Sequence, residues 1–366
     1  MSLICFYLNT CSVTLVEFKS SIVREGVMGM IVNGKWTEED KIFKNGEYIR
    51  QVSTHNEEIC DEIINAIYEQ PGRFHLITSW SCPWSHRANL IRQIKGLSPY
   101  VRLHVTGGKR VQGYPANNGN KWQVPGSERK IIHLHELYTL NDLSYTGRST
   151  VPVLWDSFTL KVVSNESSKI IRAFDAVTIK QSNSLINRDF TLIPDNILTS
   201  IDALNEQIYH CLSNGVYRAR FAQSQHAYEE AVKQVFGMLE VLDTRLASNR
   251  YLFGDVITES DWCLFPTLVR FDIDYHLHSG CSQLRLTDFP NLWGYARDLY
   301  SIDGVSKTVN FQAIHLSNYI DSVVVPLMPV HDWNTPHNRD EIGKRCVMSR
   351  MGEKFALDRT HSLCTA

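Results

Sequence analysis

The sequence predicts an α/β domain followed by an all-α domain. Between about residues 70 and 175, short apolar runs suited to strands alternate with segments of helical periodicity. After about residue 190, apolar residues recur at i, i+3 and i+4 throughout. The chain has 366 residues, which is enough for two domains. The predicted organisation is an N-terminal extension over 1–27, a first domain with a long insertion over 28–185, an all-α domain over 190–344, and a polar tail over 345–366.

The first domain is expected to contain a thioredoxin-like layer. Its predicted elements are, in order, strand 73–79, helix 83–94, strand 101–105, strands 152–156 and 159–163, and helix 166–174. Strand, helix, strand, hairpin and helix is the element order of such a layer. Residues 106–150 interrupt this order with Gly, Asn and Pro, and therefore predict a long insertion.

The second domain is predicted to be helical throughout. Its expected helices cover 198–212, 224–248, the apolar run 262–271, and 291–300. Thr258 and Asp261 precede the apolar run at the spacing of a reciprocal N-terminal cap. This cap carries folding information and no chemistry.

Charge and hydropathy favour a small-molecule partner. The formal net charge is −2, so no global basic field exists to hold a nucleic acid or an anionic membrane. No run of eighteen apolar residues appears, which predicts no membrane span. Residues 1–27 lack the basic start of a signal peptide, so we interpret them as an extension and expect a cytoplasmic protein. Organellar targeting by this segment stays open as the alternative.

The cysteines do not form a metal-binding pattern. The chain has nine, none in C-x-x-C spacing and none matched by a suitable histidine pair, so we expect no metal. The odd number favours free thiols in a reducing compartment. Most of them are expected to be small buried hydrophobic residues.

One cysteine stands apart because of its local sequence, Ser81-Cys82-Pro83-Trp84-Ser85-His86-Arg87. Cys82 lies where a strand ends and a helix begins, and Pro83 suits the first helical position. The positive end of the helix favours the thiolate form of such a cysteine, and Arg87 is expected to add to this effect. An inert buried cysteine before a helix is the alternative.

Cys82 has no neighbouring thiol to resolve a disulfide. Ser85 occupies the position that a dithiol enzyme would fill with a second cysteine. A mixed disulfide on Cys82 must then be resolved by an external thiol, most simply glutathione.

Two further features fit a glutathione site. Pro152 opens a strand, where a proline in a thioredoxin-like fold is cis and leaves the backbone of Val151 free to pair with a peptide-like ligand. Glu166 and Ser167 stand at a helix start, whose N–H groups favour an anion such as the γ-glutamyl carboxylate. A plain edge-strand proline and a simple helix cap are the alternatives.

With these residues placed, the sequence resembles the glutathionyl-hydroquinone reductases, the Xi class of glutathione transferases. The resemblance runs from about Met28 to Asp340 and rests on long motifs in the family order. They include FHLITSWSCPWSHR (74–87), YTGRSTVPVLWD (145–156), NESSKIIRAFD (165–175) and NGVYRARFAQSQHAYEEAV (214–232). The resemblance implies a glutathione transferase fold and a homodimer.

The resemblance also implies a reaction in which the Cys82 thiolate attacks the sulfur of a glutathionyl-hydroquinone. Hydroquinone leaves, and a second glutathione releases glutathione disulfide. Tyr217 is implied to face the hydroquinone. The residues implied to hold glutathione are Trp122, Arg148, Val151, Glu166 and Ser167. The alternatives are an omega-like thioltransferase or dehydroascorbate reductase, and a non-catalytic binder of glutathione conjugates.

Two positions depart from the family pattern. Ser85 replaces the usual alanine after C-P-W, a small change. More important, the motif that supplies a second substrate tyrosine appears here as Ser317-Asn318-Tyr319. An ungapped alignment places Asn318 where the tyrosine belongs, whereas a shift of one residue would place Tyr319 there. The departure therefore leaves the identity of the second substrate-binding residue open between Asn318 and Tyr319.

Overall fold

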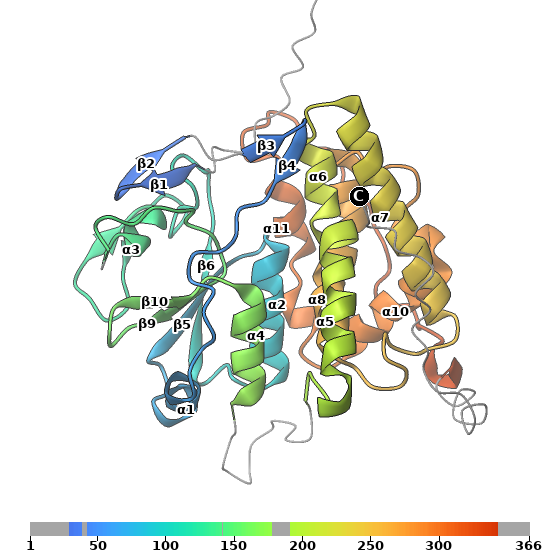
Figure 1. Cartoon of the computed structure of the whole chain (residues 1–366), viewed down its shortest axis with the longest axis horizontal. Coiled ribbons are helices and arrows are strands. Elements are labelled where there is room, and N and C mark those ends of the chain that lie inside the picture. The colour runs from blue at the N-terminus through green and yellow to red at the C-terminus, as the bar shows by residue number, and fades with distance from the viewer. Residues whose placement is uncertain (1–28, 39–41, 141, 178–190, 343–366) are drawn as a thin grey trace, which may run out of the picture.

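A four-stranded mixed sheet forms the centre of the first domain in the computed structural model (Figure 1), which describes residues 29–38, 42–140, 142–177 and 191–342. The strands lie in the order β10-β9-β5-β6, and β5 pairs in parallel with β6 and antiparallel with β9. Their bounds are β5 Phe74–Ser79, β6 Val101–Thr106, β9 Val153–Asp156 and β10 Lys161–Ser164. The predicted strand over 152–156 begins one residue later, because Pro152 has no N–H for the ladder.

Both faces of this sheet are covered. Phe74 and Leu76 of β5 pack into one core with helices α1 (Asp61–Glu69), α2 (Pro83–Ile94) and α4 (Ser167–Ala176). Ile77 of the same strand belongs to a second core on the other side, which reaches α3 (His135–Tyr138). The alternation follows from the two-residue period of a strand.

The remaining strands of the first domain form three small hairpins. The predicted insertion over 106–150 contains the pair β7 (Trp122–Gln123) and β8 (Lys130–Ile131), together with α3. Two hairpins precede the sheet and were not predicted from the sequence. They are β1 (Met30–Val32) with β2 (Lys35–Thr37) and β3 (Ile42–Lys44) with β4 (Glu47–Ile49).

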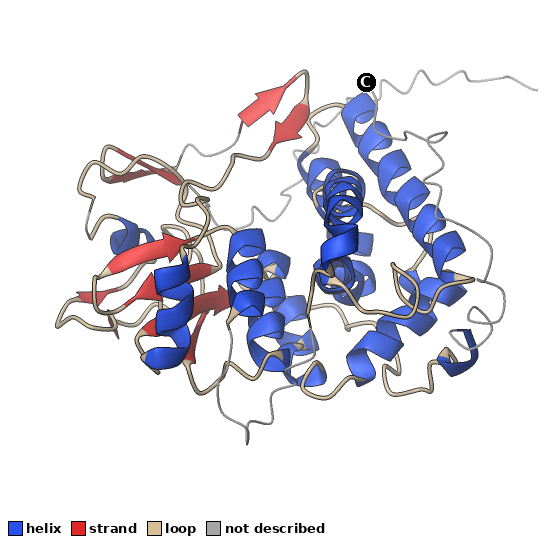
Figure 2. Ribbon diagram, turned by 60° about the horizontal axis from the view of Figure 1, so that its bottom comes forward, coloured by secondary structure: helices blue, strands red, loops and turns tan. Residues whose placement is uncertain are grey.

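The second domain is built from helices, as Figure 2 shows. The longer ones are α5 (Leu198–Gln207), α6 (Gly215–Phe221), α7 (Gln225–Leu246), α8 (Glu259–Arg270), α10 (Pro290–Ser301) and α11 (Phe311–Leu316). The predicted helix over 198–212 changes at Ile208 into a π-helical segment, Ile208–Ser213. A second π-helical segment, Phe271–Tyr275, extends α8 and leads into the single turn α9 (His276–His278).

The predicted cap of α8 is present. The Asp261 carboxylate accepts hydrogen bonds from the backbone N–H of Thr258 at 2.7 Å and from its hydroxyl at 3.0 Å. The same carboxylate also accepts from Tyr295 at 2.8 Å. The cap therefore fixes the start of α8 and joins it to α10.

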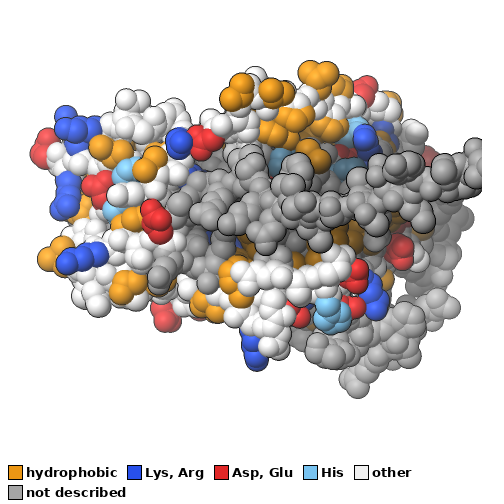
Figure 3. All heavy atoms as spheres, turned by 90° about the horizontal axis from the view of Figure 1, so that it is seen from above, with side chains coloured by type: hydrophobic (Ala, Val, Ile, Leu, Met, Phe, Trp, Pro, Cys, Tyr) orange, Lys and Arg blue, Asp and Glu red, His pale blue; other side chains and the backbone are white. Residues whose placement is uncertain are grey.

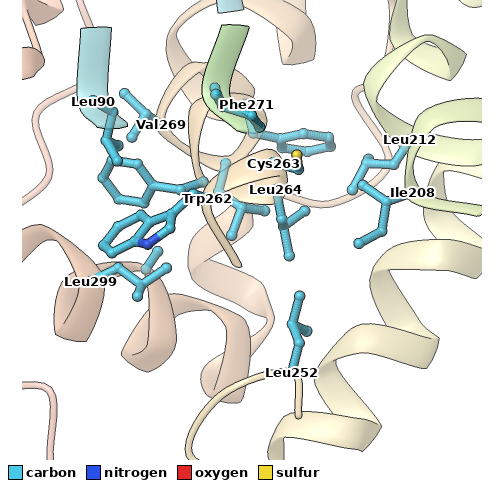
Figure 4. Packing of buried hydrophobic residues seen from close by; sticks show 14 of the residues in the cluster. Leu90, Ile208, Leu212, Leu252, Trp262, Cys263, Leu264, Val269, Phe271 and Leu299 are labelled. Atoms are coloured by element: carbon cyan, nitrogen blue, oxygen red, sulfur yellow. The ribbon is translucent and has the colours of Figure 1, made fainter. Parts of the chain in front are cut away.

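One hydrophobic core runs through both domains (Figure 4). Leu90 of α2 belongs to the same buried cluster as Trp262 and Leu264 of α8 and Ile208 and Leu212 of the π-helical segment. The first domain is thus fixed against the second through α2, the helix that begins after Cys82.

The outer surface differs between the two ends of the molecule. Seen from above, hydrophobic side chains gather along one rim towards the helical end, and basic side chains gather at the opposite end (Figure 3). The most exposed large hydrophobic residues include Val323, Leu327 and Val330, which follow α11. Within the described residues, no helix is long and apolar enough to cross a membrane. The predicted extension over 1–27 and the tail over 345–366 lie outside the described residues.

Candidate active site

Cys82 occupies the N-cap of α2. Its backbone is extended, and Pro83 takes the first helical position, as the sequence predicts. The Sγ atom accepts a hydrogen bond from the backbone N–H of Ser85 and donates one to the carbonyl of Val151, both at 3.4 Å. Only 7 % of the residue is exposed. The sulfur therefore lies at the positive end of the helix, beside the strand that follows Pro152.

The peptide bond between Val151 and Pro152 is cis, as expected of this proline in a thioredoxin-like fold. Val151 is buried and lines both of the pockets that open beside Cys82.

The first of these pockets, here called the polar pocket, lies over the start of α4. Glu166 is the N-cap of this helix, and its carboxylate accepts from the backbone N–H and hydroxyl of Ser168 at 3.1 and 3.0 Å. The hydroxyl of Ser53 donates to the other carboxylate oxygen at 2.9 Å. Ser167 also lines the pocket, and Arg148 lies at its boundary with the second pocket.

The second pocket, here called the aromatic pocket, contains the thiol. Cys82 lines it together with Trp84, Tyr114, Tyr217 and Phe221. The two pockets share Arg50, Trp84, Arg148, Thr150 and Val151, so they form one continuous cleft. The cleft lies between the strand ends of the first domain and the helices of the second.

Tyr217 on α6 faces this cleft with its ring edge-on to that of Tyr275, the centroids 5.9 Å apart. Burial, and then the nearby Tyr275 and Cys82, raise the pKa of the Tyr217 phenol well above its usual range. The phenol therefore keeps its proton at neutral pH and can donate it.

Arg50 is a site residue that sequence reasoning missed. It follows β4, and its guanidinium carbon lies 4.7 Å from the ring centroid of Tyr217 and 5.2 Å from that of Trp84. Its Nε donates to Asn214 at 2.7 Å. Burial opposes the charge, but Tyr48, Tyr217, Tyr209 and Cys82 together raise the pKa of Arg50. No local motif marks Arg50, because the residues that it contacts on and before α6 lie far from it in the sequence.

Arg87 lines the polar pocket, and its predicted effect on the Cys82 thiol stays a prediction. Its guanidinium donates to the carbonyl of Cys263 at 2.8 and 3.1 Å and so joins α2 to α8. Arg270 makes the reverse link from α8, donating to the carbonyls of Trp80 and Ser81 at 2.7 and 3.1 Å. These two arginines position the turn that carries Cys82.

The adjacent residues Asn318 and Tyr319 have different surroundings. Asn318 lines the aromatic pocket and accepts from Arg220 at 3.2 Å. The ring of Tyr319 packs instead against His278 and His315, with centroid distances of 5.1 and 5.0 Å. The structure thus brings Asn318, and not Tyr319, to the wall that includes Cys82 and Tyr217.

Trp122 packs against the hydrophobic cluster that contains Cys82 and Val151 but does not line either pocket. Its ring packs edge-on against His104 at a centroid distance of 5.2 Å. Among the described residues that line the polar and aromatic pockets, Trp122 is absent. Its predicted role in holding glutathione stays a prediction.

Two of the other described cysteines, Cys263 and Cys281, are buried. Burial raises the pKa of Cys263 and of Cys281 to about 12, so both thiols stay protonated. Across the described ranges, no group of three or more His, Cys, Asp or Glu side chains could hold a metal ion.

Comparison with known proteins gives the same division of the chain. Residues 81–177 match the family model for the glutathione S-transferase N-terminal domain, and residues 225–298 match that for the C-terminal domain. The fold and the cleft therefore define a glutathione transferase, and the predicted fold class is confirmed.

Similarity to individual proteins shows which class of glutathione transferase this chain belongs to. The chain is 36% identical over 341 residues to the glutathionyl-hydroquinone reductase YqjG of Escherichia coli, covering 86% of this chain and 99% of YqjG. The glutathione-bound structure of YqjG superposes with a TM-score of 0.66 at 37% identity, covering 74% of this chain and 89% of that one. A Xi-class transferase from Natrialba magadii gives 0.70 at 32%, covering 86% and 98%. The chain belongs to the glutathionyl-hydroquinone reductases, the Xi class of glutathione transferases.

Proposed function

We propose that this protein reduces glutathionyl-hydroquinones with glutathione, using Cys82 as the nucleophile. The observation that carries the proposal is the placement of the Cys82 sulfur at the start of α2, inside a pocket that also contains the Tyr217 phenol. A polar pocket for glutathione opens directly beside it.

In the first step, the Cys82 thiolate attacks the glutathionyl sulfur, and the bond between that sulfur and the aromatic carbon breaks. The electron pair of this bond stays with the aromatic ring, whose carbon takes up a proton, so that free hydroquinone leaves. Cys82 then carries glutathione as a mixed disulfide. The protonated Tyr217 phenol supplies or orients the proton.

In the second step, the thiolate of a second glutathione attacks the mixed disulfide. Glutathione disulfide leaves and the Cys82 thiolate is regenerated. The sum of both steps converts one conjugate and one glutathione into one hydroquinone and one glutathione disulfide, so atoms and electrons balance. Ser85, with no thiol, stands one helical turn from Cys82, which supports an external resolving thiol.

The polar pocket supports binding of the γ-glutamyl end of glutathione. Ser167, at the start of α4, offers its N–H and hydroxyl to the carboxylate, and Glu166 offers its carboxylate to the ammonium group. Val151 pairs through its backbone, and Arg148 contributes positive charge between the two pockets. The predicted contact between Trp122 and glutathione stays a prediction, and the binding mode described above does not include it.

The proposal is tested by comparing turnover on a glutathionyl-hydroquinone with turnover on a small glutathione mixed disulfide. We expect the conjugate to be the better substrate. Intact-mass measurement after exposure to the conjugate without excess thiol should show one glutathione on Cys82. Preference for the mixed disulfide would favour an omega-like thioltransferase. No turnover of either, with retained binding, would favour a non-catalytic binder.

The predicted homodimer and cytoplasmic location extend the proposal. The exposed apolar stretch that includes Val323, Leu327 and Val330 offers an apolar contact surface to a second copy. Light scattering on the full chain and on Leu327→Asp measures the oligomeric state, and cell fractionation measures the location.

A further inference from the structure

Several arginines line the aromatic pocket. Arg110 and Arg220 line this pocket and do not line the polar pocket. Arg50 and Arg148 lie at the boundary between the two pockets. Asp274 is the one acidic side chain among the described residues of this wall. Among the described residues, four arginines and one acidic residue therefore line this pocket.

Asp274 forms ion pairs with its neighbours. Its carboxylate lies 3.3 Å from Nη1 of Arg220 and 3.4 Å from Nδ1 of His278. Burial opposes ionisation, but the hydrogen bond from His278 and the charges of Arg220, His278 and Arg270 lower the pKa of Asp274 overall. Asp274 therefore stays ionised and fixes Arg220, while Arg110 lies elsewhere on the wall.

Asn318 adds a hydrogen-bond donor that the described residues leave unpaired. Nη2 of Arg220 donates to Oδ1 of Asn318 at 3.2 Å, which orients the amide. Its Nδ2 is buried and has no hydrogen-bond partner among the described residues. A buried donor without an acceptor costs free energy, so this amide suits a ligand oxygen.

The cavity also extends past the reacting sulfur. A further pocket shares Ser81, Arg110, Tyr114 and Ser317 with the aromatic pocket and continues to Thr106 and Gly107 at the end of β6. A ring substituent that projects away from the thiol therefore has space beside Arg110.

We propose that the aromatic pocket selects glutathionyl-hydroquinones whose ring carries an anionic substituent such as a carboxylate, with Arg220 and Asn318 as its main binding groups and Arg110 as a supporting charge. A guanidinium and an amide N–H together match a carboxylate better than a neutral oxygen. This inference rests on the proposed reductase function and names the substrate class of the same site.

The test compares two matched conjugates that differ in one group. One is the glutathionyl conjugate of 2,5-dihydroxybenzoate, and the other is that of 2,5-dihydroxybenzamide, which has the same shape without the charge. For the unaltered protein, we expect kcat/KM to favour the carboxylate roughly tenfold, because charge-assisted hydrogen bonds exceed neutral ones. The preference should decrease as salt is added.

A variant pair assigns the preference to the pocket. Arg220→Gln should bring the ratio of the two kcat/KM values close to one. Arg218→Gln is the matched control on the same helix, because Arg218 pairs with Gln234 and Glu47 and does not line the pocket. We expect it to keep the ratio of the unaltered protein.

The outcomes separate this inference from the function on which it rests. Turnover of unsubstituted glutathionyl-hydroquinone with a ratio near or below one in the unaltered protein overturns the inference and leaves the function standing. No turnover of any conjugate overturns the function itself. A ratio that Arg220→Gln leaves unchanged would place the anion elsewhere and overturn the assignment to Arg220.

Discussion

The polar pocket and the aromatic pocket share one cleft but are built differently. The polar pocket uses short local motifs of the first domain, such as the start of α4 at Glu166 and the turn at Val151. The aromatic pocket collects side chains from segments far apart in the chain, including Arg50, Tyr217 and Asn318. The polar pocket therefore depends mainly on local backbone geometry, whereas the aromatic pocket depends on how distant segments pack together. In the proposed reaction, the nucleophile Cys82 and the groups assigned to glutathione come from the first domain, whereas Tyr217 and Asn318 of the aromatic pocket come from the second.

The largest effect is expected at the thiol, which lines the aromatic pocket beside the polar one. Cys82→Ser should lower reductase turnover by orders of magnitude while binding of glutathione persists, because only the nucleophile is removed. Steady-state kinetics and calorimetric titration with glutathione measure the two properties. Cys60→Ser, which alters an exposed free cysteine, is the control and should retain most of the activity. Normal turnover by the Cys82→Ser variant would refute the thiol mechanism.

A smaller loss is expected on the aromatic side alone. Tyr217→Phe should lower kcat on glutathionyl-hydroquinones roughly 10- to 100-fold, since it removes a proton donor but not the thiol. The raised pKa of this phenol means that its acidic form persists, so activity that depends on it is lost only as pH rises through that raised pKa. Profiles of unaltered and variant protein between about pH 6 and 9 should therefore have the same shape. If the unaltered protein loses activity with rising pH within this range and the variant does not, the assignment of Tyr217 as the proton donor is wrong.

On the polar side, Glu166→Gln should raise the KM for glutathione roughly tenfold and change kcat little, because a charge-assisted contact to bound glutathione is lost. The ratio of activities towards different aromatic conjugates should not change. Glu69→Gln, an exposed change on α1, serves as the control. If Glu166→Gln altered aromatic selectivity instead, the division of labour between the pockets would be wrong.

The smallest effects concern the position that departs from the family pattern. With Asn318 on the pocket wall and Tyr319 packed against two histidines, Tyr319→Phe should be nearly silent. Asn318→Tyr should raise kcat on unsubstituted glutathionyl-hydroquinone a few-fold, because a phenol can donate a proton more readily than an amide. Stopped-flow measurement of hydroquinone release separates this step from resolution by glutathione. A strong defect in Tyr319→Phe would mean that Tyr319 reaches the substrate.

Local signals in the sequence predicted most of the fold. Pro83 after Cys82, the capping residues Thr258 and Asp261, and the apolar face of α4 each act over a few residues, so the helices begin close to where we expected. The π-helical segments after Gln207 and Arg270 were not predicted, because they keep helical periodicity and differ only in hydrogen-bond pattern.

The candidate site, like the fold, contains residues that local motifs predicted and residues that they did not. Cys82, Val151, Glu166 and Ser167 were found from motifs at helix starts and at a strand start, and the structure brings all four to the cleft. Arg50 and Arg220 were missed, because no spacing along the chain shows that they face a distant thiol. The effect of Arg87 on the thiol was predicted from sequence proximity and stays a prediction, whereas no local motif predicted its contact with the carbonyl of Cys263 in the second domain.

The arginine links between α2 and α8 have a consequence for how the molecule melts. The buried Arg87 reaches from the first domain to the buried Cys263, and the buried Arg270 reaches back to the half-buried Trp80 and Ser81. Separating the domains would leave both guanidinium groups without these acceptors and expose the shared core, at a cost that neither domain could recover alone. Heating should therefore produce one calorimetric endotherm for the whole chain. The turn that carries the nucleophile should lose its shape in the same transition as the helical half.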